Sequence, residues 1–569
     1  MGSLVNFREL EKEYWEWQLR EFPELSTWTG DNRYNDRFTD LSFGALENRN
    51  TDERRLLEEA KRIDPSTLSG QDVISHELLL WELSLAVSAQ QFPPVMILTQ
   101  IWGPQLMFPQ LVSVTPFGNS TDYENYLARL ASFPLYLEQV TGLLCHGISL
   151  NWVQPNGPLA GVPDQITGQI VQDIEQSPLY APLTRIPDTI AKAERERFRS
   201  EARELITQSI FPAMERFRDF VTGTYLPAGD RPIGASALPN GAAYYAHCVR
   251  EHTTTDLDPG AIHRIGLKEV ERIRARMDSI IEEAGFKGSR QEFADFLRTD
   301  SRFYFSSADD LVTAYRDIAK RADAELPGLF AELPRAPYGV RPFPDYEAPN
   351  QATAMYYPGA SDGSRAGYFM VNTYRLDMRP KYEMEALTLH EAVPGHHLQI
   401  ARAQELRHLP DFRRNASYTA YIEGWALYAE SLGARMGFYT EPYSRFGQLI
   451  YEMWRGCRLV VDTGIHCFGW TRQQAIDFMQ KHTAKTEQDI AIEVDRYIVI
   501  PGQALAYKIG ELAIKKLRAR AETILGPAFD IRRFHNAILD NGPLPLTVLN
   551  RMIEDWIKSQ KEGRGEGLG

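Results

Sequence analysis

The most restrictive feature of this sequence is a Pro-Gly pair inside an apolar, helix-forming run, Glu385 to Ile400 (EALTLHEAVPGHHLQI). Pro394 has no N–H to donate to the carbonyl of residue 390, and Gly395 permits backbone dihedrals that other residues avoid. The helix must therefore bulge or break between its two halves. Whatever the chain folds into has to accommodate this interruption together with the polar side chains beside it.

Four such side chains, His390, Glu391, His396 and His397, flank the interruption. In the H-E-x-x-H pattern of zinc peptidases, histidines four residues apart share one helical face and one ion, while the Glu acts on the bound water. On a straight helix His390 and His396 would be roughly 120° out of alignment, and His390 and His397 about 10 Å apart along the axis. A two-residue loop restores the register for His396, whereas His397 needs a three-residue loop. We expect His390 and His396 to be metal ligands, with His397 as the alternative that spacing alone does not exclude.

A third ligand is expected from the segment 417–436, SYTAYIEGWALYAESLGARM, which carries two carboxylates on one helical face. Glu423 lies 33 residues after His390, far enough for a helix-turn-helix return, and Gly424 beside it permits close helix approach. We expect Glu423 to be the third ligand and Glu430 to orient a histidine. Three protein ligands with an open fourth position are typical of a catalytic site for one Zn²⁺ ion.

Several blocks of the sequence resemble one known family. They are HEAVPGHHLQ, YIEGWALYAES, EVDRYIVIPGQALAYKIGE, LPNGAAYYAHCVREHTTTDLDP, YYPGASDGSRAGYFMVNTY and RLVVDTGIHCFGWT. In this order they are similar to the domain-of-unknown-function 885 family, from DNRYNDRFTDLS onward. The resemblance implies a mainly helical, metallopeptidase-like fold with a zinc-dependent hydrolase site. GHHL also resembles the GHAL of related oligopeptidase helices, which favours His396 as the second ligand and Glu423 as the third.

Such a site implies an enzyme that cleaves a peptide or peptide-like amide bond, with Glu391 as general base. Candidate donors to the tetrahedral oxyanion are Tyr497, Tyr507 and Arg496, with His466 as a further candidate. Two alternatives stay open. The same metal chemistry suits a small-molecule amide hydrolase or acyl transferase in a biosynthetic pathway, and a non-catalytic binding protein could keep the fold without turnover.

Most of the chain predicts helices, so the expected fold is mainly α, a large two-lobed helical body of the oligopeptidase or zincin type. Pro residues between 334 and 349 break regular structure and mark a boundary between an N-terminal helical lobe (1–333) and a catalytic metal-binding part (334–560), within one continuous body. Residues 561–569 read as a loose tail. Two β-prone runs in 352–374 predict a small hairpin or sheet next to the metal helix, and the strand at 363–374 is expected to pair with an extended substrate through its edge.

Composition narrows the partners. With 62 Lys and Arg against 76 Asp and Glu the formal net charge is −14, which disfavours nucleic acid. We find no apolar run of about 18 residues that would span a bilayer. The four cysteines are scattered and the N-terminus lacks a signal-peptide core, so we expect reduced thiols and a cytoplasmic protein. A small molecule or short peptide is the expected substrate, and the oligomeric state is open.

Overall fold

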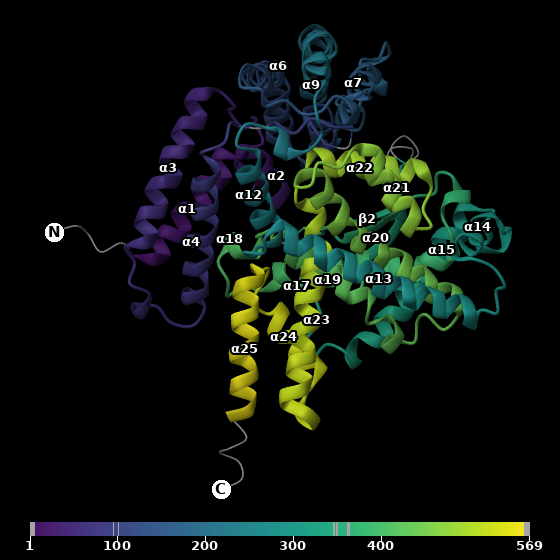
Figure 1. Cartoon of the computed structure of the whole chain (residues 1–569). Coiled ribbons are helices and arrows are strands. Elements are labelled where there is room, and N and C mark those ends of the chain that lie inside the picture. The colour runs from purple at the N-terminus through teal and green to yellow at the C-terminus, as the bar shows by residue number, and fades with distance from the viewer. Residues whose placement is uncertain are drawn as a thin grey trace. The chain divides into compact units, whose positions relative to one another are not determined.

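The computed structural model describes residues 6–562, apart from 95, 101, 345–347, 349–350, 361–362 and 364. Across these residues the chain is mainly helical and carries a small three-stranded sheet, as the sequence predicts (Figure 1). Contacts divide it into two compact units, Met1–Tyr244 with Ile498–Ile500, and Tyr245–Tyr497 with Pro501–Gly569. The boundary predicted at residue 334 lies inside the second unit. No helix in the described ranges combines the length and the apolar character that crossing a bilayer requires.

The first unit is a set of helices around an apolar core. Its longest helix, α6 (Ser120–Ser149), begins with a capping box between Asn119 and Asp122 and buries aromatic and aliphatic side chains against α9 (Lys192–Leu205) and α10 (Phe211–Phe220). Its other α-helices are α1 (Phe7–Glu21), α2 (Pro23–Thr29), α3 (Phe43–Lys61), α4 (Gln71–Ala89), α5 (Pro104–Val112), α7 (Val162–Gln169), α8 (Ala181–Thr184) and α11 (Leu226–Ala228). Helix α12 (Gly241–Thr253) crosses into the second unit.

The second unit holds every predicted site residue. Two helices form its centre, α20 (Pro442–His466), which is almost entirely buried, and α13 (Pro259–Glu283), which packs along it. Asp258 caps α13, and Pro259 is its first residue. The other α-helices are α14 (Arg290–Thr299), α15 (Ala308–Glu325), α16 (Met384–Glu391), α17 (His396–Glu405), α18 (Asp411–Arg414), α19 (Thr419–Glu430), α21 (Arg472–His482), α22 (Glu487–Val499), α23 (Ala506–Leu525), α24 (Ile531–Leu539) and α25 (Leu546–Glu562).

The sheet has the order β1-β3-β2, from β1 (Tyr338–Pro342), β2 (Ala354–Tyr357) and β3 (Gly367–Val371). Strand β3 pairs in parallel with β1 and antiparallel with β2. The expectation that the 363–374 strand offers its edge to substrate is wrong, because β3 is central and both of its edges are already paired. The edge strand nearest the histidine helix is β2, which contacts α16.

Two further differences from the sequence-based expectations concern prolines and the C-terminus. The proline-rich segment 334–349 contains strand β1 instead of lacking regular structure, since Pro342 stands at its last position, where a missing N–H costs little. The predicted tail at 561–569 begins inside α25, and residues 563–569 lie outside the described residues.

Candidate metal centre

The Pro-Gly interruption breaks the helical run into two helices. Helix α16 ends at Glu391, residues 392–395 form a short connection with a cis Val393–Pro394 bond, and α17 begins at His396. A side chain at Gly395 would collide with the carbonyl oxygen of His390, so only glycine fits here. The indole of Trp425, on α19, donates a 2.8 Å hydrogen bond to the carbonyl of Pro394. This hydrogen bond from α19 fixes the position of the connection between α16 and α17.

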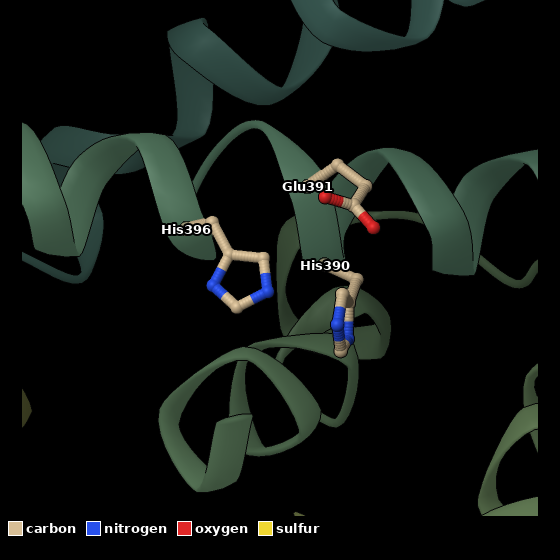
Figure 2. A group of neighbouring side chains, drawn as sticks. All are labelled: His390, Glu391 and His396. Carbon is tan, nitrogen blue, oxygen red and sulfur yellow. The ribbon is translucent and has the colours of Figure 1, made fainter. Parts of the chain in front are cut away.

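This break brings three predicted site residues together. His390 and Glu391 project from the end of α16 and His396 from the start of α17, toward one shared space (Figure 2). One ligand atom from each of the three lies within 4.8 Å of the others. His396, six residues after His390 in sequence, therefore reaches the position that a four-residue spacing would give on an unbroken helix.

Glu423 completes the cluster from α19. Its Oε2 lies 3.7 Å from Nε2 of His390 and 3.6 Å from Nε2 of His396. Burial would raise the pKa of Glu423, but the two histidines hold it well below its usual range. We refer to His390, Glu391, His396 and Glu423 as the metal cluster.

The donor set and its spacing fit a small divalent cation. Distances of 3.6 and 3.7 Å are too long for good hydrogen bonds. Ligands about 2.0–2.1 Å from one tetrahedral ion are separated by roughly 3.3 Å, close to these values. Among the described residues, Oε2 of Glu423 is buried and has no hydrogen-bond partner. Two imidazoles and one carboxylate around such an orphaned oxygen are a set that suits zinc.

Glu430 lies behind His390, in the position predicted for an orienting carboxylate. Its Oε1 is 2.8 Å from Nδ1 of His390, and its side chain is fully buried. Burial would lower the pKa of His390, but the neighbouring carboxylates of Glu423 and Glu430 raise it to about 9. A carboxylate on Nδ1 fixes the tautomer that presents Nε2 to the cluster.

Glu391 is held by the sheet. The backbone N–H of Tyr356, in β2, donates a 2.8 Å hydrogen bond to Oε2 of Glu391. Burial raises the pKa of Glu391, although the neighbouring His396 and His390 act in the opposite direction. A raised pKa brings a carboxylate closer to the range in which it accepts and returns protons near neutral pH.

Tyr507 lies on α23, which is in direct contact with α19, the helix that carries Glu423. A Cβ at Gly424 of α19 would lie 2.5 Å from the Cα of Gly510 in α23, so the two backbones are in direct contact, as the glycine beside Glu423 suggested. Burial raises the pKa of Tyr507, and the charge of Glu423 raises it further. Its hydroxyl therefore keeps its proton and can donate it in a hydrogen bond.

The other predicted donors are engaged elsewhere. The hydroxyl of Tyr497 donates to Glu493 at 2.8 Å, and Arg496 binds the same carboxylate at 2.9 Å. Nε2 of His466 lies 2.8 Å from the carbonyl of Tyr497, and burial lowers its pKa to about 4. The structure does not bring these three side chains into the metal cluster.

The alternative ligand His397 faces away from the metal cluster. Its Nδ1 lies 2.8 Å from the hydroxyl of Tyr356, and its ring packs on Tyr338 at a centroid distance of 4.5 Å. His397 thus joins α17 to strands β1 and β2, the same sheet that holds Glu391.

Sequence reasoning missed two residues that shape this centre. Tyr356 acts through its backbone amide, which any residue type supplies, so no sequence signal marks it. Trp425 lies two residues after Glu423 in the EGW motif, and a large aromatic residue next to a small one and a predicted ligand was the available signal.

Fold and site together define a class: a mainly helical protein with a small sheet and a buried cluster of two histidines and two carboxylates at a helix break. The chain belongs to the family described as bacterial protein of unknown function (DUF885), whose model matches residues 23–553. No curated protein matches it.

Two solved structures are similar over nearly the whole length. One, described as "the putative lipoprotein from Colwellia psychrerythraea", is 27% identical with a TM-score of 0.90, covering 98% of this chain and 100% of that chain. The other, "a putative lipoprotein of unknown function from Shewanella oneidensis", is 17% identical with a TM-score of 0.74, covering 97% and 100%. The second likeness concerns the fold alone.

Proposed function

We propose that this protein is a zinc-dependent hydrolase that cleaves an amide bond in a short peptide or peptide-like substrate. The observation that carries the proposal is the convergence of three ligand atoms, from His390, His396 and Glu423, beside the buried carboxylate of Glu391. A purely structural zinc site would be closed by four ligands and would not need a base beside it. A zinc ion held there would supply Lewis acidity, activating water and polarising the scissile carbonyl.

The side chains of this chain would then perform the proton transfers. Glu391 would take a proton from the attacking water through one carboxylate oxygen, while the Tyr356 amide holds the other. As the C–N bond breaks, Glu391 would return that proton to the nitrogen, so that the leaving group departs as a neutral amine. The protonated hydroxyl of Tyr507, beside Glu423, is the best-placed donor to the oxygen that develops negative charge.

The sheet offers a place for an extended substrate. Strand β2 is an edge strand, and the side of it that faces away from β3 is the side on which Tyr356 reaches Glu391. A peptide that pairs with this edge would pass directly along the metal cluster. Small-molecule amides would meet the same chemistry, so the choice between peptides and other amides depends on the walls of the site.

Metal analysis of the purified full-length chain tests the metal part of the proposal. We expect about one zinc per chain, lost in His396→Ala and retained in His397→Ala, a matched control because the neighbouring histidine points to the sheet. Equal zinc loss in both variants, or a wild-type protein that never binds zinc without chelator present, would contradict it.

A peptide and N-acyl amine screen tests the catalytic part. Hydrolysis by the wild type should fall about 10³-fold in Glu391→Gln while zinc content stays the same. A zinc-loaded chain that hydrolyses neither substrate class would instead favour a binding protein on this fold.

The cytoplasmic location remains a prediction from the sequence, and the two similar structures are described as putative lipoproteins.

A further inference from the structure

Helix α20 presents two arginines, one turn apart, to Tyr507. The guanidinium carbon of Arg458 lies 4.3 Å from the centre of the Tyr507 ring, and that of Arg455 lies 6.0 Å from it. Each side chain is only 8% exposed. Arg455 lies 3.9 Å from Glu430, which is hydrogen bonded to His390 at 2.8 Å, so the pair of arginines adjoins the surroundings of the metal cluster.

Each of these arginines has a buried N–H group without a partner. Among the described residues, Nη1 of Arg458 and Nε of Arg455 make no hydrogen bond. The other donors of Arg458 are used, since Nη2 binds Glu493 at 2.8 Å and Nε binds the hydroxyl of Tyr497 at 3.0 Å. Buried donors are nearly always satisfied in folded proteins, so two orphans at one place point to a missing acceptor.

The charges around Arg458 do not balance either. Arg458 and Arg496 share one carboxylate, that of Glu493. Asp462, one turn further along α20, is bound by the hydroxyl of Tyr245 and the amide of Gly502, and burial raises its pKa to about 7. One buried positive charge is therefore left without a full counter-charge, which is unfavourable unless a ligand supplies the anion.

Arg455 adds to this excess. Its nearest acid is Glu430, at 3.9 Å, and the same carboxylate is already hydrogen bonded to His390. The missing ligand group is thus an acceptor with negative charge and at least two oxygens. A carboxylate has two oxygens, one for each orphaned N–H group, and carries the negative charge that balances a guanidinium.

Resting on the proposed hydrolase function, we propose that Arg458, supported by Arg455, binds a free carboxylate of the substrate, one or two residues from the scissile amide. A residue spans at most about 3.6 Å of extended chain, so a carboxylate close in sequence to the scissile amide suits arginines that adjoin the metal cluster through Glu430. The substrates are then short peptides cut near their C-terminal end, and chains with a blocked C-terminus are poor substrates.

Binding without turnover tests this assignment. The probes are N-acetyl-alanyl-alanine as the free acid and the same peptide as its C-terminal amide, titrated calorimetrically into zinc-loaded full-length Glu391→Gln protein. We expect the acid to bind at least about tenfold more tightly than the amide. Adding Arg458→Gln should remove this preference by weakening only the acid, and Arg458→Lys should restore part of it.

Arg445→Gln is the matched control, because Arg445 lies near the start of the same helix and pairs with Glu283 at 2.7 Å. It should leave the preference unchanged. If Arg458→Gln does not fold, the assignment is tested with Arg455→Gln and with the comparison of the acid and amide peptides in protein that keeps both arginines. Equal binding of the two peptides, binding of neither, or equal weakening of both by Arg458→Gln overturns the assignment.

These outcomes are separable from a failure of the proposed function. Suppose that the wild-type chain holds zinc and cleaves the blocked peptide as fast as the free acid. This result would support the hydrolase function and contradict the carboxylate-binding role of Arg458. A chain that neither binds zinc nor hydrolyses an amide would contradict the hydrolase function, whichever peptides it binds.

Discussion

Two buried clusters of charge lie around adjacent residues of α23, and they are built on opposite principles. In the first, the ammonium of Lys508 is fully buried and lies 2.6 Å from Glu511, 2.9 Å from Glu452 and 3.0 Å from Glu269. We refer to these four residues as the Lys508 cluster. The second is the metal cluster, next to Tyr507, where Oε2 of Glu423 has no partner among the described residues.

The difference separates structural from functional use of buried charge. Burial would raise the pKa of Glu452, but Lys508, Lys515 and Arg272 hold it well below its usual range, so cations of the chain itself neutralise the Lys508 cluster. In our proposal, the metal cluster takes its cation from a bound zinc ion. Opposed responses to mutation follow from this contrast.

The largest stability effect is expected from Lys508→Met. Removing the ammonium leaves three carboxylates together in the interior, which should lower the free energy of unfolding by about 3–5 kcal/mol. Urea denaturation measures it. Lys515→Met, at the 35% exposed rim beside Glu511, should cost far less. Equal losses in the two variants would mean that the Lys508 cluster is no more structural than a surface ion pair.

Glu423→Gln should behave in the reverse way. It removes the orphaned negative charge, so the metal-free protein should be within about 1 kcal/mol of the wild type in stability. Zinc affinity should fall by about a hundredfold or more, equivalent to about 2.7 kcal/mol. Competition with a chelating dye measures the affinity. A strongly destabilised apo variant with unchanged zinc affinity would place Glu423 in the structural category instead.

A third variant tests the contact between α19, which carries Glu423 of the metal cluster, and α23, which carries Lys508. Gly510→Ala would push the helices apart and should cost about 1–3 kcal/mol in stability, with weaker zinc binding as well. Gly142→Ala is the matched control, since this helical glycine of α6 faces open space and alanine there should be neutral or stabilising. If the two substitutions have the same effect, the close approach is not needed.

How far the sequence predicts this molecule depends on whether a feature is local. The helix break at Pro394-Gly395 and the capping boxes at Ser289 and Thr471 follow from residues a few positions apart, and all are present. The approach of α19 to α23 was suggested by Gly424 alone.

Features that depend on tertiary contacts were not predictable. Strand β1 forms because β3 supplies its hydrogen bonds, and the sequence of the proline-rich segment does not indicate that β3 is its partner. Arg455 and Arg458 look like ordinary charged positions of a helix, and only the packing of α20 against α22 and α23 buries them. The choice between His396 and His397 needed the backbone path through residues 392–395, which the spacing alone left open.

Asp462 provides a fourth test, because among the described residues no cation is bonded to its buried carboxylate. Its partners are the hydroxyl of Tyr245, at 2.6 Å, and the amide of Gly502, at 3.1 Å. Burial therefore raises its pKa from 3.8 to about 7, despite these hydrogen bonds. Asp462 avoids a buried negative charge by keeping its proton. The Lys508 cluster neutralises its carboxylates with an ammonium, and in our proposal the metal cluster does so with a bound ion.

The sign of the pH dependence follows from this raised pKa. Near pH 4 and below, the carboxyl of Asp462 holds its proton in the folded protein and largely in the unfolded chain, so its contribution to stability is present in full. As pH rises toward 7, the unfolded chain releases the proton first, and stability falls by at most about 1.4 kcal/mol per pH unit. Asp462→Asn has no proton to lose, so its stability relative to the wild type should rise between about pH 4 and pH 7 and then level off. Urea denaturation of both proteins at pH 5, 6, 7 and 8 measures this difference. A constant difference would mean that Asp462 is ionised in the folded protein, and the charge excess at Arg458 would then be smaller than we infer.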